Sequence, residues 1–269
     1  MVDHPALFHK YEVLRDIFRR LGSSLVAFSG GIDSSLLLKV AHETLGEKAI
    51  GVTAVSPTFP AIELETVRRV AEEIGAALQI VETDQLQIAE FVRNDASRCF
   101  HCKTDLYQRL DHIRRKLGFE GIVDGTHLDD LGDDRPGVLA ARAFGVRSPL
   151  VEAGLGKSEI RALAKALGLS NWDKPAAACL SSRIPRGSPI SRMKLARIER
   201  AEALLLREGV RQVRVRDHDG IARIELDPDS MALLHDPLRR ERIAGELKAY
   251  GFRFVTLDLE GYRSGSTNG

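Results

Sequence analysis

The chain has 269 residues, 43% hydrophobic and 29% charged, which is ordinary globular usage and excludes a collagen-like, coiled-coil or disordered protein. Its formal net charge of +1 gives no general attraction to nucleic acid or to a membrane surface. The charge is unevenly divided, because residues 1–150 carry 22 acidic and 18 basic side chains, whereas residues 151–269 carry 16 and 21. An anionic ligand would therefore find more partners in the second part.

No apolar stretch approaches the length needed to span a bilayer, and charged residues interrupt the apolar positions of residues 1–16. We therefore expect neither a membrane segment nor a signal peptide, but a cytoplasmic protein whose three cysteines stay reduced. In that compartment a cysteine is either a small buried hydrophobe or a metal ligand or nucleophile.

The first part of the chain alternates short apolar runs with amphipathic segments. Strands are expected over residues 24–28, 49–56, 77–83 and 121–127, and helices over residues 5–21, 33–45, 61–74 and 157–168. Strands of this buried type, separated by helices, indicate an α/β fold with a parallel sheet covered by helices on both faces. The loops after Phe28, Ser56 and Gly125 should then meet at the carboxyl edge, where such sheets bind ligands.

The pattern changes near residue 191. The segments 193–208, 210–216, 221–226, 238–250 and 252–259 predict the order α-β-β-α-β. We therefore expect two domains, residues 1–190 and a small C-terminal α+β domain of residues 191–269. The Pro- and Ser-rich stretch 174–189 would link them.

The strongest single motif, S-G-G-I-D-S-S, lies between an expected buried strand and an expected helix. Its two glycines allow a sharp turn that presents N–H groups to an anion, and the helix N-terminus adds positive potential. The candidate phosphate-binding residues are Ser29, Gly30, Gly31, Asp33 and Ser34. The serine hydroxyls would donate to phosphate and Asp33 would hold Mg²⁺. A plain helix N-cap is the simpler alternative, but the position and completeness of the motif favour a phosphate loop.

This motif resembles the signature of the PP-loop ATP pyrophosphatases. The resemblance implies that ATP is bound, that its α-phosphate is attacked, and that pyrophosphate leaves an adenylated substrate. The superfamily includes amide-forming ligases, ammonia-using synthetases, RNA-thiolating enzymes and small-molecule sulfur transferases. The loop alone does not choose among them.

Cys99 and Cys102 form a C-x-x-C pair, and Cys179 stands further along the chain. Each lies beside Arg, Lys or Ser in what we expect to be a polar loop, and the basic neighbours favour the reactive thiolate. Those neighbours are Arg98, Lys103 and Arg183. Two metal sites remain open: Zn²⁺ completed by His101 or another residue, or an iron–sulfur cluster with one iron not held by protein.

With these residues in view, the chain resembles the LarE family of sulfur transferases over nearly its whole length. The resemblance is carried by SGGIDSS, DGTHLDDLGDDRPG, KSEIRALAKALGL, NWDKPAAACLSSRIPRG, VRVRDHDGIARIEL and FVTLDLEGYRSG. It implies a mononucleotide substrate, pyridinium-3,5-biscarboxylic acid mononucleotide, in biosynthesis of the nickel-pincer cofactor of lactate racemase. A carboxylate is adenylated and then converted to a thiocarboxylate. The resemblance also implies a homo-oligomer, a hexamer, with no nucleic-acid or membrane partner.

The family has two sulfur chemistries. In one, a single cysteine gives up its own sulfur and becomes dehydroalanine; Cys179 stands at that position. In the other, three cysteines resemble the ligands of a [4Fe–4S] cluster whose fourth iron can carry hydrosulfide. Cys99, Cys102 and Cys179 favour the cluster type, and Cys179 and Asp33 are the expected catalytic residues.

The resemblance assigns the substrate phosphate to four residues: Ser182, Arg183, Arg214 and Arg216. Arg214 and Arg216 lie two apart on one expected strand, so they share a face, and the guanidinium fork suits phosphate. The alternative is a solvated strand face on which Arg223 and Glu225 are cross-strand partners.

An acidic cluster follows the fourth expected strand and comprises Asp124, Asp129, Asp130, Asp133 and Asp134. It is either a solvated loop or a contact to Mg²⁺ or ribose, the latter best supported for Asp124. Trp172, the single tryptophan, is expected to pack rather than to stack on a ligand.

Three other classes of protein remain as alternatives. An RNA-thiolating enzyme would need an RNA-binding module, and no basic–aromatic tract is present. An ammonia-using or amide-forming synthetase would have no use for three thiols. A nucleotide sensor without catalysis is disfavoured by the intact Asp33 and by the cysteines.

Overall fold

The computed structural model describes residues 5–131, 136–175 and 178–263. The chain divides into two compact units, one of Met1–Thr83 with Cys99–Ala177 and one of Asp84–Arg98 with Ala178–Gly269. Each unit has its own sheet and its own apolar core. The domain boundary expected at residue 190 stays a prediction.

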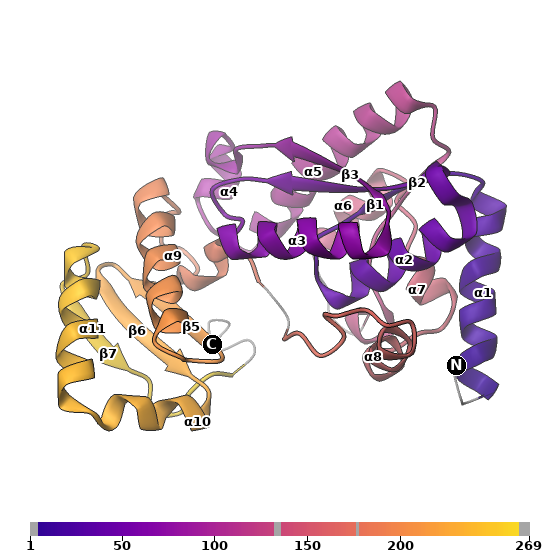
Figure 1. The fold of residues 1–269 in the computed structure, drawn as a ribbon. Helices are drawn as coiled ribbons and strands as arrows, with labels where there is room; N and C mark the ends of the chain where they lie inside the picture. The colour runs from indigo at the N-terminus through magenta and orange to yellow at the C-terminus, as the bar shows by residue number, and fades with distance from the viewer. Residues whose placement is uncertain (1–4, 132–135, 176–177, 264–269) are drawn as a thin grey trace. The chain divides into compact units, whose positions relative to one another are not determined.

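The first unit is built on four parallel strands in the order β3-β2-β1-β4 (Figure 1). They are β1 (Ser24–Ala27), β2 (Ala49–Val55), β3 (Ala77–Glu82) and β4 (Gly121–Val123). The expected parallel α/β sheet is thus confirmed, and β1 lies inside the sheet between β2 and β4. The expectation that β3 is a buried strand is wrong: it has β2 as its one neighbour, and none of its side chains is fully buried.

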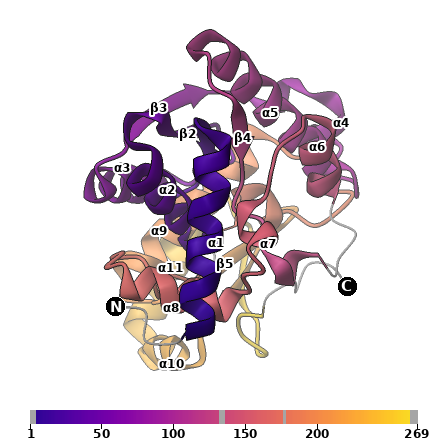
Figure 2. The same ribbon diagram turned by 90° about the vertical axis from the view of Figure 1, so that its right-hand side faces the viewer.

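Helices cover both faces of this sheet (Figures 1 and 2). One face shares its core with α1 (Pro5–Leu21), α2 (Ile32–Leu45), α3 (Ala61–Ile74) and α8 (Lys157–Ala166). On the other face, α5 (Arg98–Leu117) packs Leu110 and Ile113 against strand residues such as Leu25. The shorter helices of this unit are η1 (Gly46–Lys48), η3 (Leu128–Asp130), α6 (Pro136–Ala143) and α7 (Pro149–Glu152). Because helices cover both faces of the sheet, the inner strands do not alternate apolar with polar residues.

The second unit has a three-stranded sheet in the order β5-β6-β7. β5 (Val213–His218) is antiparallel to β6 (Ile221–Leu226), and β7 (Phe254–Leu257) is parallel to β6. Asp219 and Gly220 join β5 to β6 with positive φ values of 51° and 95°, the conformation that a two-residue hairpin turn requires.

Two helices, α9 (Arg192–Arg207) and α11 (Pro237–Ala249), supply core residues with one face of this sheet. The expected α-β-β-α-β order is therefore present, with α10 (Pro228–Met231) and η5 (Ala232–His235) added between β6 and α11. The unit also contains η2 (Gln85–Gln87), α4 (Ala89–Val92) and η4 (Leu180–Arg183).

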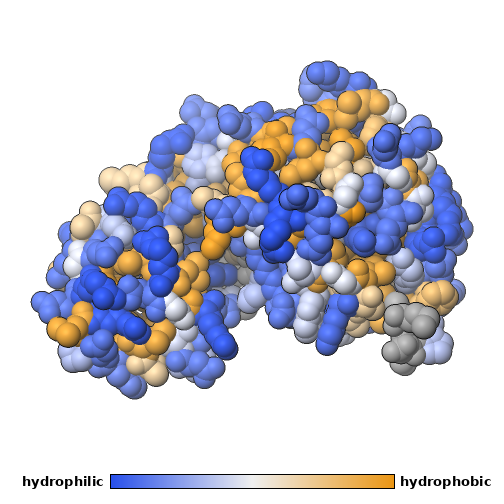
Figure 3. Space-filling model, in the orientation of Figure 1, coloured by the Kyte–Doolittle hydropathy of each residue, from blue (hydrophilic) through white to orange (hydrophobic). Residues whose placement is uncertain are grey.

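The face drawn in Figure 3 is mostly hydrophilic, with apolar residues in separate patches on both units, as is usual for protein surfaces. Among the described residues, no helix has both the length and the apolar character that a membrane crossing requires.

Helix α5 is the main departure from the sequence expectations. Cys99 and Cys102, expected in a polar loop, lie in the first turns of this helix. The helix buries Tyr107, Leu110 and Ile113, which recur three residues apart, and its remaining positions are largely charged or polar. This narrow apolar stripe is a weak signal for a helix. Because the stripe begins after the cysteines, the sequence did not indicate that Cys99 and Cys102 are helical.

Candidate functional site

The segment Ser29–Ser34 turns sharply between β1 and α2. Gly30 has a left-handed φ of 72°, and a Cβ added there would lie 2.9 Å from Cγ2 of Val67 on α3. Both the backbone angle and the space therefore require glycine at this position. Gly31 then caps α2 with an extended backbone.

The polar side chains of the loop are held in place before any ligand binds. The Oγ atoms of Ser29 and Ser34 lie 3.1 Å apart, and Ser34 donates to the Gly31 carbonyl at 3.0 Å. From behind, the buried Asn171 donates to the Gly30 carbonyl at 3.0 Å and to Ser35 Oγ at 2.9 Å. The loop is thus a preorganised turn at the carboxyl end of β1.

Asp33, in the first turn of α2, is paired with a residue that the sequence analysis missed. Lys157 Nζ donates to both carboxylate oxygens, at 2.6 and 2.7 Å. The backbone N–H of Lys157 donates to Asp129 Oδ2 at 2.6 Å, which places the start of α8 beside the loop. A lysine at a helix N-terminus interacts unfavourably with the helix dipole. Its position at the start of an expected helix was therefore the sequence signal that could have pointed to Lys157 as a site residue.

The loop after β4 meets the phosphate loop, as expected for two neighbouring parallel strands. A Cβ added to Gly125 would lie 3.0 Å from the backbone N of Ser34 and 3.2 Å from Cβ of Asp33. His127 Nε2 lies 3.8 Å from Asp33 Oδ1 and 3.5 Å from Asp130 Oδ2. His127 is therefore a second residue of this site that the sequence analysis missed.

The carboxylate of Asp124 is held by hydrogen bonds from three neighbouring residues. Its carboxylate accepts hydrogen bonds from Tyr107 Oη at 2.9 Å, Ser148 Oγ at 2.8 Å and the Thr126 N–H at 3.2 Å. Burial, and then the charge of Asp124, raise the pKa of Tyr107, so the phenol remains the donor. These bonds give Asp124 a structural role, and its contact with Mg²⁺ or ribose stays a prediction.

Of the other acidic residues, Asp129 and Asp130 lie beside Lys157 and His127, as described above. Asp133 and Asp134 fall outside the described residues. Trp172 packs against the first core, as expected, with Lys165 Nζ 4.5 Å from its ring centroid.

None of the three cysteines, all of which lie in the described part of the chain, forms a disulfide. Cys99 is exposed and Cys102 half-buried; their i, i+3 spacing puts them on one face of α5, in the first unit. Cys179, in the second unit, is exposed and directly precedes η4, with its Sγ 2.9 Å from Ser181 Oγ. Within the described part of the chain, no three His, Cys, Asp or Glu side chains form a group that could hold a metal ion.

Arginine side chains gather around Ser182 in the second unit. Arg183 makes a bidentate pair with Glu202 at 2.9 and 3.0 Å, and its Nη1 donates to Ser182 Oγ at 3.1 Å. Arg216 makes a bidentate pair with Glu225 at 3.0 and 2.8 Å, and its Nη1 donates to the Ser182 carbonyl at 3.0 Å. The structure therefore brings three of the four predicted phosphate-binding residues together.

Arg214 completes this cluster. Its guanidinium lies 5.2 Å from the Tyr262 ring centroid. Burial lowers the pKa of Arg214, and the positive charges of Arg183 and Arg216 lower it further. Glu202 pairs with Arg183 and Glu225 pairs with Arg216, so a bound anion would act mainly on the charge of Arg214.

The expected alternative, a solvated strand face, is wrong for the central pair. Arg216 is 5% exposed and Glu225 is fully buried, while Arg223 shares the same carboxylate at 2.9 Å. The partners foreseen for that alternative, Arg223 and Glu225, do pair, but Glu225 is buried and Arg223 is half-buried. A buried ion pair of this kind fixes the direction of the arginines.

A parallel sheet whose inner strand leads through S-G-G-I-D-S-S into a helix defines a PP-loop nucleotide-binding protein. No protein-family model matches the chain. An uncharacterized protein of Synechocystis sp. is 43% identical over 259 residues, 96% of this chain and 97% of its own length. The pyridinium-3,5-bisthiocarboxylic acid mononucleotide synthase of Lactiplantibacillus plantarum is 41% identical over 245 residues, 90% of this chain and 88% of its own. The chain belongs to the family of this synthase, the LarE family.

A more distant similarity links the chain to a second kind of PP-loop enzyme. The glutamine-hydrolyzing GMP synthase of Aeropyrum pernix is 26% identical over 217 residues, which cover 73% of this chain and 42% of that protein.

Proposed function

We propose that the protein is an ATP-dependent sulfur transferase that acts on pyridinium-3,5-biscarboxylic acid mononucleotide. It would adenylate a carboxylate and convert it to a thiocarboxylate, in the biosynthesis of the nickel-pincer cofactor of lactate racemase. One observation carries the proposal: Arg183 Nη1 donates both to the Cys179 carbonyl at 3.0 Å and to Ser182 Oγ at 3.1 Å. A thiol and an anion site that would hold the substrate phosphate therefore adjoin each other, in a family that includes a pyridinium-3,5-bisthiocarboxylic acid mononucleotide synthase.

The first half-reaction uses the loop Ser29–Ser34. The N–H groups and hydroxyls of the loop would bind the pyrophosphate end of ATP, and Asp33, a hard oxygen donor, would hold Mg²⁺ there. A substrate carboxylate oxygen attacks the α-phosphorus, the bond to the bridging oxygen breaks, and pyrophosphate leaves with both electrons. Lys157, which forms an ion pair with Asp33, would supply positive charge to the phosphates when Asp33 holds the metal.

The second half-reaction brings sulfur to the acyl-adenylate. Cys99, Cys102 and Cys179 would be the ligands of a [4Fe–4S] cluster; in support, none of these thiols is in a disulfide or fully buried, and Cys99 and Cys102 share one helix face. Such a cluster, when bound by three cysteines, offers a fourth iron that can carry sulfide to the acyl carbon. The substrate phosphate would be held by Ser182, Arg183, Arg214 and Arg216.

The alternative sulfur source is Cys179 itself. Its thiolate would attack the acyl carbon and AMP would leave. Loss of the Cα proton and cleavage of the Cβ–S bond would then release the thiocarboxylate and leave dehydroalanine. In both chemistries an acyl-adenylate meets a sulfur nucleophile. A hexameric assembly in the cytoplasm completes the proposal, on the strength of the family resemblance alone.

The test is an assay of purified protein with ATP, Mg²⁺, the biscarboxylate mononucleotide and sulfide, under anaerobic conditions. We expect AMP and pyrophosphate in equal amounts, and a thiocarboxylate product of higher mass. Release of ADP, or a requirement for tRNA or ammonia in place of the mononucleotide and sulfide, would overturn the proposal.

A further inference from the structure

Asn94 is fully buried and has a left-handed backbone, with a φ of 58°. This conformation costs energy for any residue except glycine, so it persists where surrounding contacts determine it. The Asn94 side chain makes those contacts. Its Nδ2 donates to three backbone carbonyls, those of Ile184 at 3.3 Å, Pro185 at 2.8 Å and Ser188 at 2.9 Å.

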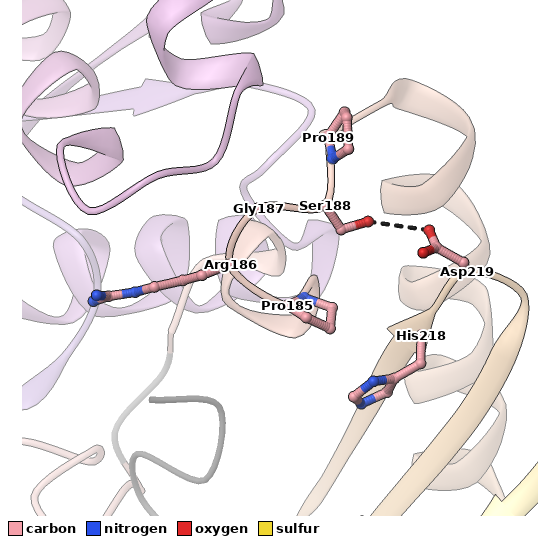
Figure 4. A pocket seen from close by; sticks show the side chains of 7 residues that line it. All are labelled: Pro185, Arg186, Gly187, Ser188, Pro189, His218 and Asp219. Atoms are coloured by element: carbon pink, nitrogen blue, oxygen red, sulfur yellow. Dashed lines mark hydrogen bonds between the residues drawn. The ribbon is translucent and has the colours of Figure 1, made fainter. Parts of the chain in front are cut away.

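Backbone bonds add to this attachment. Gly187 N–H donates to the Asn94 carbonyl at 3.1 Å, and Ile190 N–H donates to the Val92 carbonyl at 3.0 Å. The segment around Asn94 thus runs beside the loop of residues 184–190. Residues 185–189 of the same loop line a pocket of about 460 Å³ with His218 and Asp219, where Ser188 Oγ donates to Asp219 at 3.0 Å (Figure 4).

A continuous path leads from Asn94 to the Cys179 thiol within the second unit. Asn94 Oδ1 accepts a hydrogen bond from Arg98 Nη1 at 2.7 Å, and the same nitrogen donates to the Ser181 carbonyl at 3.1 Å. Ser181 is buried, and its hydroxyl lies 2.9 Å from Cys179 Sγ. Arg98 is also the residue that precedes Cys99 in the chain.

We infer that Asn94 is a positioning residue for the sulfur-transfer step. Through Arg98 and Ser181 it holds the Cys179 segment in place. Asparagine suits this position because its amide donates to carbonyls and accepts from a guanidinium at once, and because it tolerates the left-handed backbone better than most residues. The inference rests on the proposed function, which gives Cys179 its part in sulfur transfer.

The test compares two half-reactions in one protein. Asn94→Gly removes the side chain and keeps the backbone free to adopt a positive φ. We expect the ratio of thiocarboxylate formed to pyrophosphate released to fall at least tenfold, because adenylation continues and misplaced sulfur lets water hydrolyse the acyl-adenylate. A lower fraction of folded protein would reduce both products equally, so the ratio reports positioning alone.

A second readout needs neither substrate nor metal. In metal-free protein, hydrogen exchange at the Ser182 and Ile184 amides, which close the turn after Cys179, should become at least tenfold faster in Asn94→Gly. Arg93→Ala is the control: Arg93 is the exposed neighbour of Asn94 in the same segment, and its side chain lies near Asp95, with Nε 3.9 Å from Oδ2. We expect this control to leave both the ratio and the exchange rates within about twofold of the parent.

Arg98→Met tests the path itself. A methionine has no N–H group in its side chain, so it cannot donate to the Asn94 side chain or to the Ser181 carbonyl as Nη1 of Arg98 does. If both residues act through one path, the double variant lowers the ratio no further than either single variant. An unchanged ratio in Asn94→Gly, or additive losses in the double variant, would overturn the inference. Absence of any thiocarboxylate from the parent would instead contradict the proposed function.

Discussion

Lys157 Nζ donates to both carboxylate oxygens of Asp33, at 2.6 and 2.7 Å, across 124 positions of the chain. The pair lies at the carboxyl end of the sheet, and both side chains are partly exposed, at 30% and 24%. A ligand can therefore reach it without unfolding the loop. In the proposed reaction, Asp33 would hold Mg²⁺ and the charge of Lys157 would be available to the phosphates.

The first prediction concerns Asp33. Asp33→Ala should abolish pyrophosphate release, because the carboxylate that would hold Mg²⁺ is gone. The thermal unfolding temperature should change little, since the loop is held by Asn171 and by its own hydroxyls. Pyrophosphate release that persists in this variant, or ADP in place of AMP, would show that the assignment of the loop is wrong.

Lys157 gives a second prediction. Lys157→Met removes one charge-assisted interaction with the phosphates, worth about 1.5–3 kcal/mol, so kcat/KM for ATP should fall by roughly one to two decades. Lys157→Arg, which keeps the charge, should retain more of the activity. The KM for the mononucleotide should stay near its parent value. If the Lys157→Met enzyme has the ATP kinetics of the parent, Lys157 is only a structural partner of Asp33 and does not act on the phosphates.

For the substrate phosphate, Arg214 is the cleanest probe of the arginine cluster. Its guanidinium lies 5.2 Å from the Tyr262 ring centroid and donates to the Val213 carbonyl at 2.7 Å. Replacing Arg183 or Arg216 would also break a buried ion pair with a glutamate. Arg214→Met should raise the KM for the mononucleotide by roughly one to two decades, the cost of one charge-assisted contact, while ATP binding stays unchanged.

Arg211→Met is the control for that variant, because Arg211 is an exposed arginine on the approach to the same strand. It should leave the KM for the mononucleotide unchanged. An equal loss of affinity for ATP and for the mononucleotide in Arg214→Met would contradict the phosphate assignment.

The buried pair Arg216–Glu225 predicts an effect on stability. Arg216→Met removes the bidentate partner of the fully buried Glu225, to which Arg223 also donates, so the free energy of unfolding should fall by about 3–5 kcal/mol. Urea unfolding of the parent and the variant measures this difference. A loss below about 1 kcal/mol would mean that water reaches this carboxylate.

The last prediction separates the two sulfur chemistries. Cys99→Ala removes a proposed cluster ligand and leaves the candidate sacrificial residue Cys179 in place. With the cluster chemistry, both the iron content and the turnover with sulfide should collapse after anaerobic reconstitution. With the sacrificial chemistry, the variant would still make one product per chain, and mass spectrometry would find dehydroalanine at position 179.

Cys102→Ala is the matched variant for that experiment. Under the cluster chemistry it should behave as Cys99→Ala does, because the two thiols share one face of α5. If both variants keep full turnover with sulfide, a three-cysteine cluster is excluded.

Local features of the chain were predictable from the sequence. The expected helices 5–21 and 61–74 coincide with α1 and α3, because each shows a wide apolar stripe with helical period. The sharp turn at Ser29–Ser34 was also predictable, since its two glycines and its place between a buried strand and a helix are local properties. Its role in binding phosphate stays a prediction. The hairpin strands of the second unit followed from their alternation of apolar and charged residues.

Contacts between residues far apart in the chain were decided by the tertiary structure. Lys157 reaches Asp33 because α8 packs beside α2, and Asn94 reaches the loop 184–188 because both belong to the second unit. Helix α5 depends on burying Leu110 and Ile113 against the sheet and Tyr107 against α6, a stabilisation that exists once these elements have packed together. The period of the apolar residues in a sequence predicts which face of a helix or strand is buried. Which side chain hydrogen-bonds to a given carboxylate or carbonyl is determined by how these elements pack together.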